Sequence, residues 1–133
     1  VLSDRARGSD AFYIDNMIPA CIHQDRSTAM AVVRNMLTSY VLLPNYRNYW
    51  KQAGYEEEMR AAEAVINAGN LEQVAFCLPD RWLADVSLFG NASQVREGIE
   101  AWFDSGVKTP IIVPKSAAGG QLQAIQEFFD LWD

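Results

Sequence analysis

The chain is poor in the residues that build metal and redox sites. Its 133 residues include one histidine and two cysteines, and Cys21 and Cys77 do not form a CxxC pair. A zinc site takes about four nitrogen, sulfur or oxygen ligands, usually Cys and His, so no plausible zinc-binding set is present. Both cysteines stand in apolar stretches far apart in the sequence, which favours buried, reduced thiols over a disulfide. We therefore predict no metal site and a reducing, cytoplasmic compartment.

Clustered positive charge and long apolar runs are also missing. The 11 lysines and arginines are scattered singly among 17 acidic residues, which gives a net charge of −6. Phosphate backbones are bound by clustered Lys and Arg, so this balance argues against nucleic acid as a partner. No apolar run reaches the roughly 18 residues that span a bilayer, and Pro44 interrupts the longest candidate. We predict no membrane association.

The clearest pattern that is present is a helix followed by a strand, between residues 86 and 114. Asn91 or Ser93 can cap the helix, and Gly106 supplies the left-handed residue that commonly ends one. The apolar residues of this helix recur at three- and four-residue spacing: Val95, Ile99, Trp102 and Phe103. The strand, residues 111–113, is apolar without alternation, which is typical of a parallel strand covered on both faces. This pattern predicts an α/β fold.

A second strand is predicted over residues 12–22, where β-branched and aromatic residues are dense. Asp25 can cap the helix that follows, and Pro44 ends it. Further short helices follow as far as residue 84. A last helix, residues 121–132, is expected to turn its apolar side chains inward: Leu122, Ile125, Phe128, Phe129 and Trp132.

Together these elements predict one partial domain, residues 1–133, with two parallel strands and about five helices, predominantly helical. Its parts are a strand and turn at 11–23, a helical insertion at 26–85, and a final helix, strand and helix at 86–133. A connection between parallel strands needs only about a dozen residues, so the insertion is far longer than the connection requires. In α/β barrels, insertions after a strand commonly wall or cover the active site.

Several short motifs also occur in a distinctive order. They are the sequence ACIHQD at the end of the first strand, the spacing of Tyr40, Pro44 and Tyr46, the pair Gly54-Tyr55, and the stretch LPDRWLADVSLFGNASQVREGIEAWFDSGVKTPIIVP. Together they resemble the C-terminal part of the bacterial-luciferase-like monooxygenase family. The resemblance implies a TIM barrel that uses a reduced flavin such as FMN, or a deazaflavin, to act on a small-molecule substrate.

The resemblance also implies that much of a barrel is absent from this sequence. A (β/α)₈ barrel has eight strands and about 250 residues, so six strands and much of the cofactor site would lie upstream of Val1. Because two strands leave sheet edges exposed, we expect a homo-oligomer. The expected function is a part of a flavin- or deazaflavin-dependent oxidoreductase, supplying active-site wall and lid. The alternative is a small, acidic, helical interaction or oligomerisation module without catalytic activity.

No catalytic or cofactor-binding residue can be assigned from the sequence, but His23 is a candidate for substrate contact. It follows the first predicted strand, at the end where barrel enzymes carry catalytic groups, and an imidazole there can move protons. The alternative, which the sequence favours, is a polar turn residue ahead of the Asp25 cap.

Tyr46 and Arg47 are further candidates, in a cluster with Tyr49 and Trp50. Arg47 can hold a phosphate or carboxylate while the rings wall an apolar pocket. The alternative is ordinary helix packing, with the rings buried and Arg47 extended to water. The sequence slightly favours packing.

Lys115 and Ser116 are the last candidates, at the start of a loop that ends at Gly120. Backbone donors, a helix N-terminus and a lysine can form an anion cradle there. The favoured alternative is a flexible connection. The acidic run at residues 56–58 is interpreted as the first turn of a solvated helix.

Overall fold

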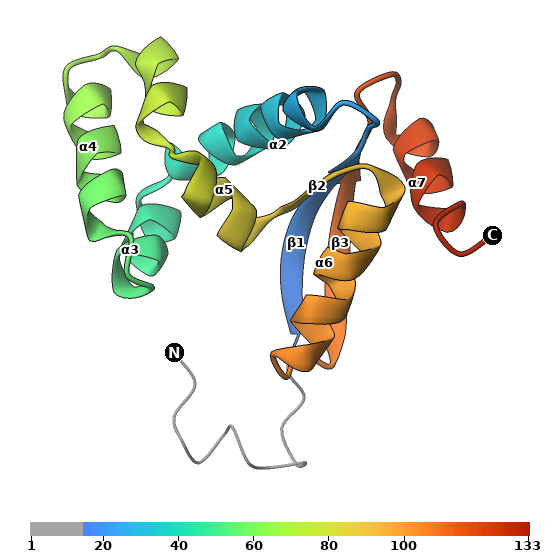
Figure 1. The fold of residues 1–133 in the computed structure, drawn as a ribbon. Helices are drawn as coiled ribbons and strands as arrows, with labels where there is room; N and C mark the ends of the chain where they lie inside the picture. The colour runs from blue at the N-terminus through green and yellow to red at the C-terminus, as the bar shows by residue number, and fades with distance from the viewer. Residues whose placement is uncertain (1–14) are drawn as a thin grey trace.

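The structure, a computed structural model, describes residues 15–133 (Figure 1). This part of the chain has an α/β fold with three strands, six α-helices and one 3₁₀ helix. In chain order the elements are β1 (Asp15–Ile22), α2 (Arg26–Val41), α3 (Pro44–Gln52), α4 (Glu56–Asn67), the 3₁₀ helix η1 (Leu71–Cys77), α5 (Asp80–Val86), β2 (Leu88–Gly90), α6 (Ala92–Asp104), β3 (Thr109–Lys115) and α7 (Gln121–Phe129).

The three strands form one parallel sheet in the order β2-β1-β3. β1 pairs with β3 from Asp15 opposite Thr109 to Cys21 opposite Lys115. The pairing of β1 with β2 is short and involves only residues 20–22 of β1. The two predicted strands are therefore parallel neighbours, and the chain crosses β1 when it passes from β2 to β3.

The predicted count of two strands and about five helices is wrong. The third strand, β2, occupies residues 88–90, where no strand is predicted from the sequence. All three of its residues are buried, so it has no alternation that would mark it as a strand. Residues 86–133 thus contain a strand before the predicted helix, strand and helix. Residues 12–14 of the predicted first strand lie outside the described residues.

Each face of the sheet has its own core. On one face, Cys21 and Phe89 pack against α2 and the helices of the insertion. On the other face, Ile18 and Ala20 pack against α6 and α7. In Figure 1 the insertion, α2 to α5, extends away from the sheet, while α6 lies in front of it. Between β1 and β2 the chain is helical, from the start of α2 at Arg26 to the end of α5 at Val86.

α6 has the ends that the sequence predicts. The Asn91 side chain accepts a hydrogen bond from the Gln94 backbone N–H at 3.0 Å, and Oε1 of Gln94 accepts one from the Asn91 N–H at 3.1 Å. This reciprocal capping box starts the helix. Gly106, with φ +100°, follows its last turn.

The predicted inward faces of two helices are partly wrong. On α6, Phe103 is half exposed. On α7 and the residues after it, Phe128 is buried, but the exposed fractions of Leu122, Phe129 and Trp132 are 84%, 69% and 63%. The helical spacing predicts which side chains share a face of the helix. Burial of that face also requires another element that packs against it. The apolar stripe of α7 lies in solvent.

The described sheet has three strands and is not closed into a barrel. β1 and β3, the two predicted strands, are parallel neighbours, as consecutive strands of a (β/α)₈ barrel are, and the short β2 pairs with the other side of β1. Here β3 is an edge strand, and Ile111 is 40% exposed, so the predicted coverage of this strand on both faces is incomplete. No helix within residues 15–133 combines the length and apolarity that crossing a membrane requires.

Candidate functional site

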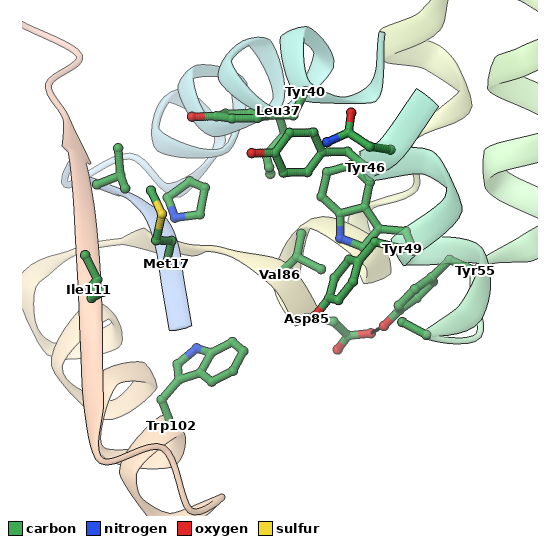
Figure 2. Close-up of a pocket in the computed structure, with 15 residues that line it drawn as sticks. Met17, Leu37, Tyr40, Tyr46, Tyr49, Tyr55, Asp85, Val86, Trp102 and Ile111 are labelled. Atoms are coloured by element: carbon green, nitrogen blue, oxygen red, sulfur yellow. Dashed lines mark hydrogen bonds between the residues drawn. The ribbon is translucent and has the colours of Figure 1, made fainter. Parts of the chain in front are cut away.

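A cavity of about 830 Å³ lies between the sheet and the helical insertion (Figure 2). Its size is within the range of roughly 300–1,000 Å³ that is common for small-molecule sites. Six aromatic side chains line it: Tyr40, Tyr46, Tyr49, Trp50, Tyr55 and Trp102. Figure 2 shows Met17 and Ile111 of the sheet across the cavity from Tyr46 and Tyr49. The cavity is therefore an aromatic site with one wall made by the sheet.

α3 forms the opposite wall with one face of its helix. Tyr46, Tyr49, Trp50 and Ala53 recur at three- and four-residue spacing and all line the cavity. Their rings contact one another: the Tyr46 and Trp50 ring centroids are 5.7 Å apart, and those of Tyr49 and Trp50 are 6.4 Å apart. Trp50 also packs edge-on against the buried Trp82 at 4.9 Å. The wall is thus anchored in the core of the insertion.

The other face of α3 carries its positive charges. Arg47 is 8% exposed; its Nη1 donates to the Val41 carbonyl at 2.7 Å, and its Nε contacts Oε1 of Glu63 at 3.3 Å. Lys51 Nζ lies 2.7 Å from Oε2 of the same glutamate. The Lys51 hydrogen bond, together with that of Arg47, holds the pKa of Glu63 below its usual value. Arg47 thus ties α3 to α2 and α4, and it is not among the residues that line the cavity.

Asp85 contributes a carboxylate to the cavity wall. The Tyr55 hydroxyl donates a hydrogen bond to its Oδ2 at 2.5 Å. Partial burial, followed by the hydrogen bond and the charge of Asp85, raises the pKa of Tyr55 to about 12. The hydroxyl therefore stays a donor across the physiological pH range and orients the carboxylate.

His23 lies at the carboxyl edge of the sheet. Its backbone N–H donates to the Gly90 carbonyl at 2.8 Å, which continues the pairing of β1 with β2. Its Nδ1 accepts a hydrogen bond from the Asp25 N–H at 3.0 Å. Asp25 in turn caps α2 by accepting from the Ser27 N–H and the Thr28 hydroxyl, and these bonds, the Thr28 one foremost, lower its pKa. His23 is thus held in the turn before the helix.

Lys115 and Ser116 lie at the same edge, at the end of β3. Ser116 Oγ accepts hydrogen bonds from the Ala118 and Gly119 N–H groups, at 3.1 and 3.2 Å, and donates to Oε1 of Glu127 at 2.8 Å. Two backbone donors of this loop are therefore already engaged by a side chain. The Lys115 side chain is exposed. An anion would compete with Ser116 for these donors.

The strand order makes this edge a topological switch point. The order β2-β1-β3 reverses direction at β1, and ligands of parallel α/β sheets commonly bind beyond the carboxyl ends of the strands at such a point. The structure thus brings His23, Lys115 and Ser116 to one edge. Tyr46 belongs to the separate aromatic cavity, while Arg47 is turned toward α4.

Several cavity residues are not among the candidate site residues that the sequence predicts. Tyr40, Tyr55, Asp85 and Trp102 come from different elements and meet only through the tertiary fold. The three- and four-residue spacing of the aromatic residues in α3 is the one local sequence pattern that predicts a wall of the cavity. No sequence pattern predicts a role for Asp85, because a single acidic residue in a short helix is usually an ordinary surface residue.

No group of three or more potential metal ligands occurs within residues 15–133. Comparisons of the chain with protein-family models, with curated proteins and with solved structures found no match.

Proposed function

We propose that this chain forms part of a flavin- or deazaflavin-dependent oxidoreductase of the luciferase-like type, acting on a small molecule in the cytoplasm. The observation that carries the proposal is the aromatic cavity, which is large enough for a planar ring system. When bound, such a cofactor supplies hydride transfer or, for a flavin, oxygen activation at its ring. The residues of this chain bind and orient the ring and exclude water from one side of it.

The side chains of the cavity fit a tricyclic ring. Tyr46, Tyr49 and Trp102 offer faces and edges for stacking, and the apolar side chains of Met17 and Ile111 offer a flat surface on the sheet. The part of the sheet that lines the cavity is open to such a ligand, because Met17 is 61% exposed and Ile111 is 40% exposed.

A cofactor phosphate would need a cation, and Lys115 is the candidate. Side chains alternate along a strand, so Lys115 lies on the same face of the sheet as Ile111 and Val113, which line the cavity. It lies roughly 7 Å beyond Val113, at about 3.3 Å per residue. A ring in the cavity with its phosphate-bearing chain along β3 would reach Lys115.

The barrel architecture belongs to the proposal as well. The two predicted strands, β1 and β3, are parallel neighbours, as consecutive barrel strands are, which supports this part of the proposal. Within the described residues, β2 covers only residues 20–22 on the other side of β1, which leaves the rest of that edge for a further strand.

Titration of the 133-residue chain with FMN, riboflavin and a deazaflavin tests the proposal. We expect saturable quenching of flavin fluorescence, weakened by Tyr46→Ala and not by Phe76→Ala, which removes an exposed ring outside the cavity. Lys115→Ala should weaken FMN binding and leave riboflavin binding unchanged. The absence of saturable binding by all three compounds would refute the proposal for this chain.

A second candidate is an oligomerisation module, favoured by the apolar stripe of α7. Leu122, Ile125 and Phe129 recur at three- and four-residue spacing on α7, and Trp132 follows the end of the helix; their side chains are 84%, 37%, 69% and 63% exposed. A single stripe can pair with its own copy across a two-fold axis. Sedimentation equilibrium should then show a dimer that Phe129→Glu dissociates and Gln126→Glu, at another exposed position of α7, does not. A monomer at all concentrations would refute this candidate.

A further inference from the structure

We propose that the aromatic cavity selects organic cations, binding a ring-bearing ammonium group against its tyrosine and tryptophan faces with Asp85 as the counter-ion. The inference goes beyond the proposed function, because it concerns the charge of the ligand and holds whether or not a flavin shares the cavity. It is based on which charged side chains face the cavity and which are turned away from it.

Asp85 is the one charged residue among the cavity-lining residues of the described chain. Its carboxylate accepts the Tyr55 hydroxyl, which is a neutral donor and leaves the negative charge in place. The carboxylate is also fixed in position by that bond at 2.5 Å, so a ligand would meet an oriented acceptor.

The cations on the helices of the tyrosine wall have acidic partners of their own. Arg81 lies over the Tyr55 ring at 5.6 Å, but its Nη2 contacts Oε1 of Glu58 at 3.2 Å. Arg47 and Lys51 of α3 both contact Glu63, on the side of the helix away from the cavity. The charge of Asp85 is therefore the uncompensated one at this wall.

The rings add attraction for a cation of their own. The faces of Trp and Tyr carry negative potential, and a cation within about 6 Å of a ring centre is stabilised by it. Tyr40 and Tyr46 stand edge to face with centroids 5.0 Å apart, and Tyr49 is 61% exposed. These rings and Asp85 line the same cavity, so an ammonium group bound there would be attracted by the ring faces and by the carboxylate, whereas an anion would be repelled by both.

Three probes that share a naphthalene ring and differ in charge test this selection. They are a naphthyl trimethylammonium cation, neutral naphthol and naphthalenesulfonate, each titrated into the 133-residue chain by calorimetry at neutral pH and low salt. We expect the cation to bind at least about tenfold more tightly than the sulfonate, with naphthol between them.

Three variants separate the effects of charge, fold and ring faces on binding. Asp85→Asn should weaken cation binding by about fivefold to tenfold, leave naphthol within about twofold and strengthen the sulfonate. Glu72→Gln removes the same charge at an exposed position outside the cavity and should change none of the three. Tyr49→Leu keeps an apolar side chain but removes a ring face, so it should weaken the cation more than naphthol.

Equal binding of cation and sulfonate would overturn the proposal, as would equal effects of Asp85→Asn and Glu72→Gln. Absence of binding by every probe would overturn it too. Flavin titrated into the same samples keeps the two proposals apart: cation selection without flavin binding contradicts only the proposed function. Flavin binding without cation selection contradicts only the present inference.

Discussion

The Tyr55 hydroxyl donates a 2.5 Å hydrogen bond to Oδ2 of Asp85, which joins the start of α4 to α5 beside the aromatic cavity. Arg81, one turn before Asp85, covers the Tyr55 ring and contacts Glu58 of α4. Because two adjacent contacts link the same helices, α4 and α5 are held together where they meet the cavity. The orientation of Asp85 is thus a product of helix packing.

Tyr55→Phe tests this contact. We expect the variant to lose about 0.5–1.5 kcal/mol of stability at neutral pH, since one solvent-exposed hydrogen bond is removed and the ring is kept. The pKa of Tyr55 is raised from 10.0 to about 12, so folding favours the protonated hydroxyl. The wild type should therefore lose this contribution as the pH rises through that interval, and the variant should not. Urea denaturation across alkaline pH measures it; parallel curves for the two proteins would contradict the prediction.

Much of the fold can be predicted because several elements carry their own end signals. α6 has Asn91 and Gln94 at its start and Gly106 after its last turn, and α3 begins at Pro44 and is followed by Gly54, with φ +104°. β2 has no such signal. All three of its residues are buried, so the strand shows no alternation of polar and apolar residues. Its sequence therefore cannot be distinguished from any other short apolar stretch.

The burial of α7 cannot be predicted from periodicity alone. Its apolar positions satisfy the helical pattern, yet Phe128 is buried and Phe129 is 69% exposed, because α6 and the sheet contact one side of the helix. The candidate site has the same limit. Tyr46 can be found from the aromatic spacing in α3, whereas Asp85 and Trp102 reach the cavity only through contacts between distant segments.

Glu63→Gln tests the ion pairs that orient α3. Removing the carboxylate leaves Arg47, 8% exposed, with its hydrogen bond to the Val41 carbonyl but without its acidic partner, so we expect a loss of about 1–3 kcal/mol at neutral pH. Because the pKa of Glu63 is lowered, its ion pairs contribute their full stabilisation of the fold above the ordinary pKa of 4.5. This stabilisation is lost as the pH falls through the lowered pKa. The variant should therefore be less sensitive to acid than the wild type.

The control for this variant is Glu56→Gln, which removes an exposed pair with Arg60 four residues along α4. Such pairs contribute about 0.3–0.5 kcal/mol. Thermal melts of the three proteins give the comparison. Equal losses in both variants would show that Glu63 has no special role in holding α3.

The two thiols should differ sharply in reactivity. Cys21 is fully buried, and burial, with a smaller effect of the Glu127 charge, raises its pKa to about 11. Cys77 is partly exposed on η1. Because the thiolate is the reactive form, iodoacetamide at mildly alkaline pH should label Cys77 first, and Cys21 only after unfolding. Mass spectrometry of digested samples distinguishes the sites; equal rates in the native protein would contradict the burial of Cys21.

Gly90→Ala should be among the most damaging single substitutions at the carboxyl edge of the sheet. Gly90 has φ +135°, and a Cβ there would lie 2.2 Å from Oε1 of Gln94, the atom that accepts the Asn91 N–H in the capping box of α6. Backbone strain and loss of the cap should together cost about 2–4 kcal/mol. Gly120→Ala is the matched control, because a Cβ at Gly120 meets no atom within 4 Å and its φ is −85°. Chemical denaturation should separate the two variants clearly; a stable Gly90→Ala protein would mean that Gln94 moves aside and that the capping box is dispensable for α6.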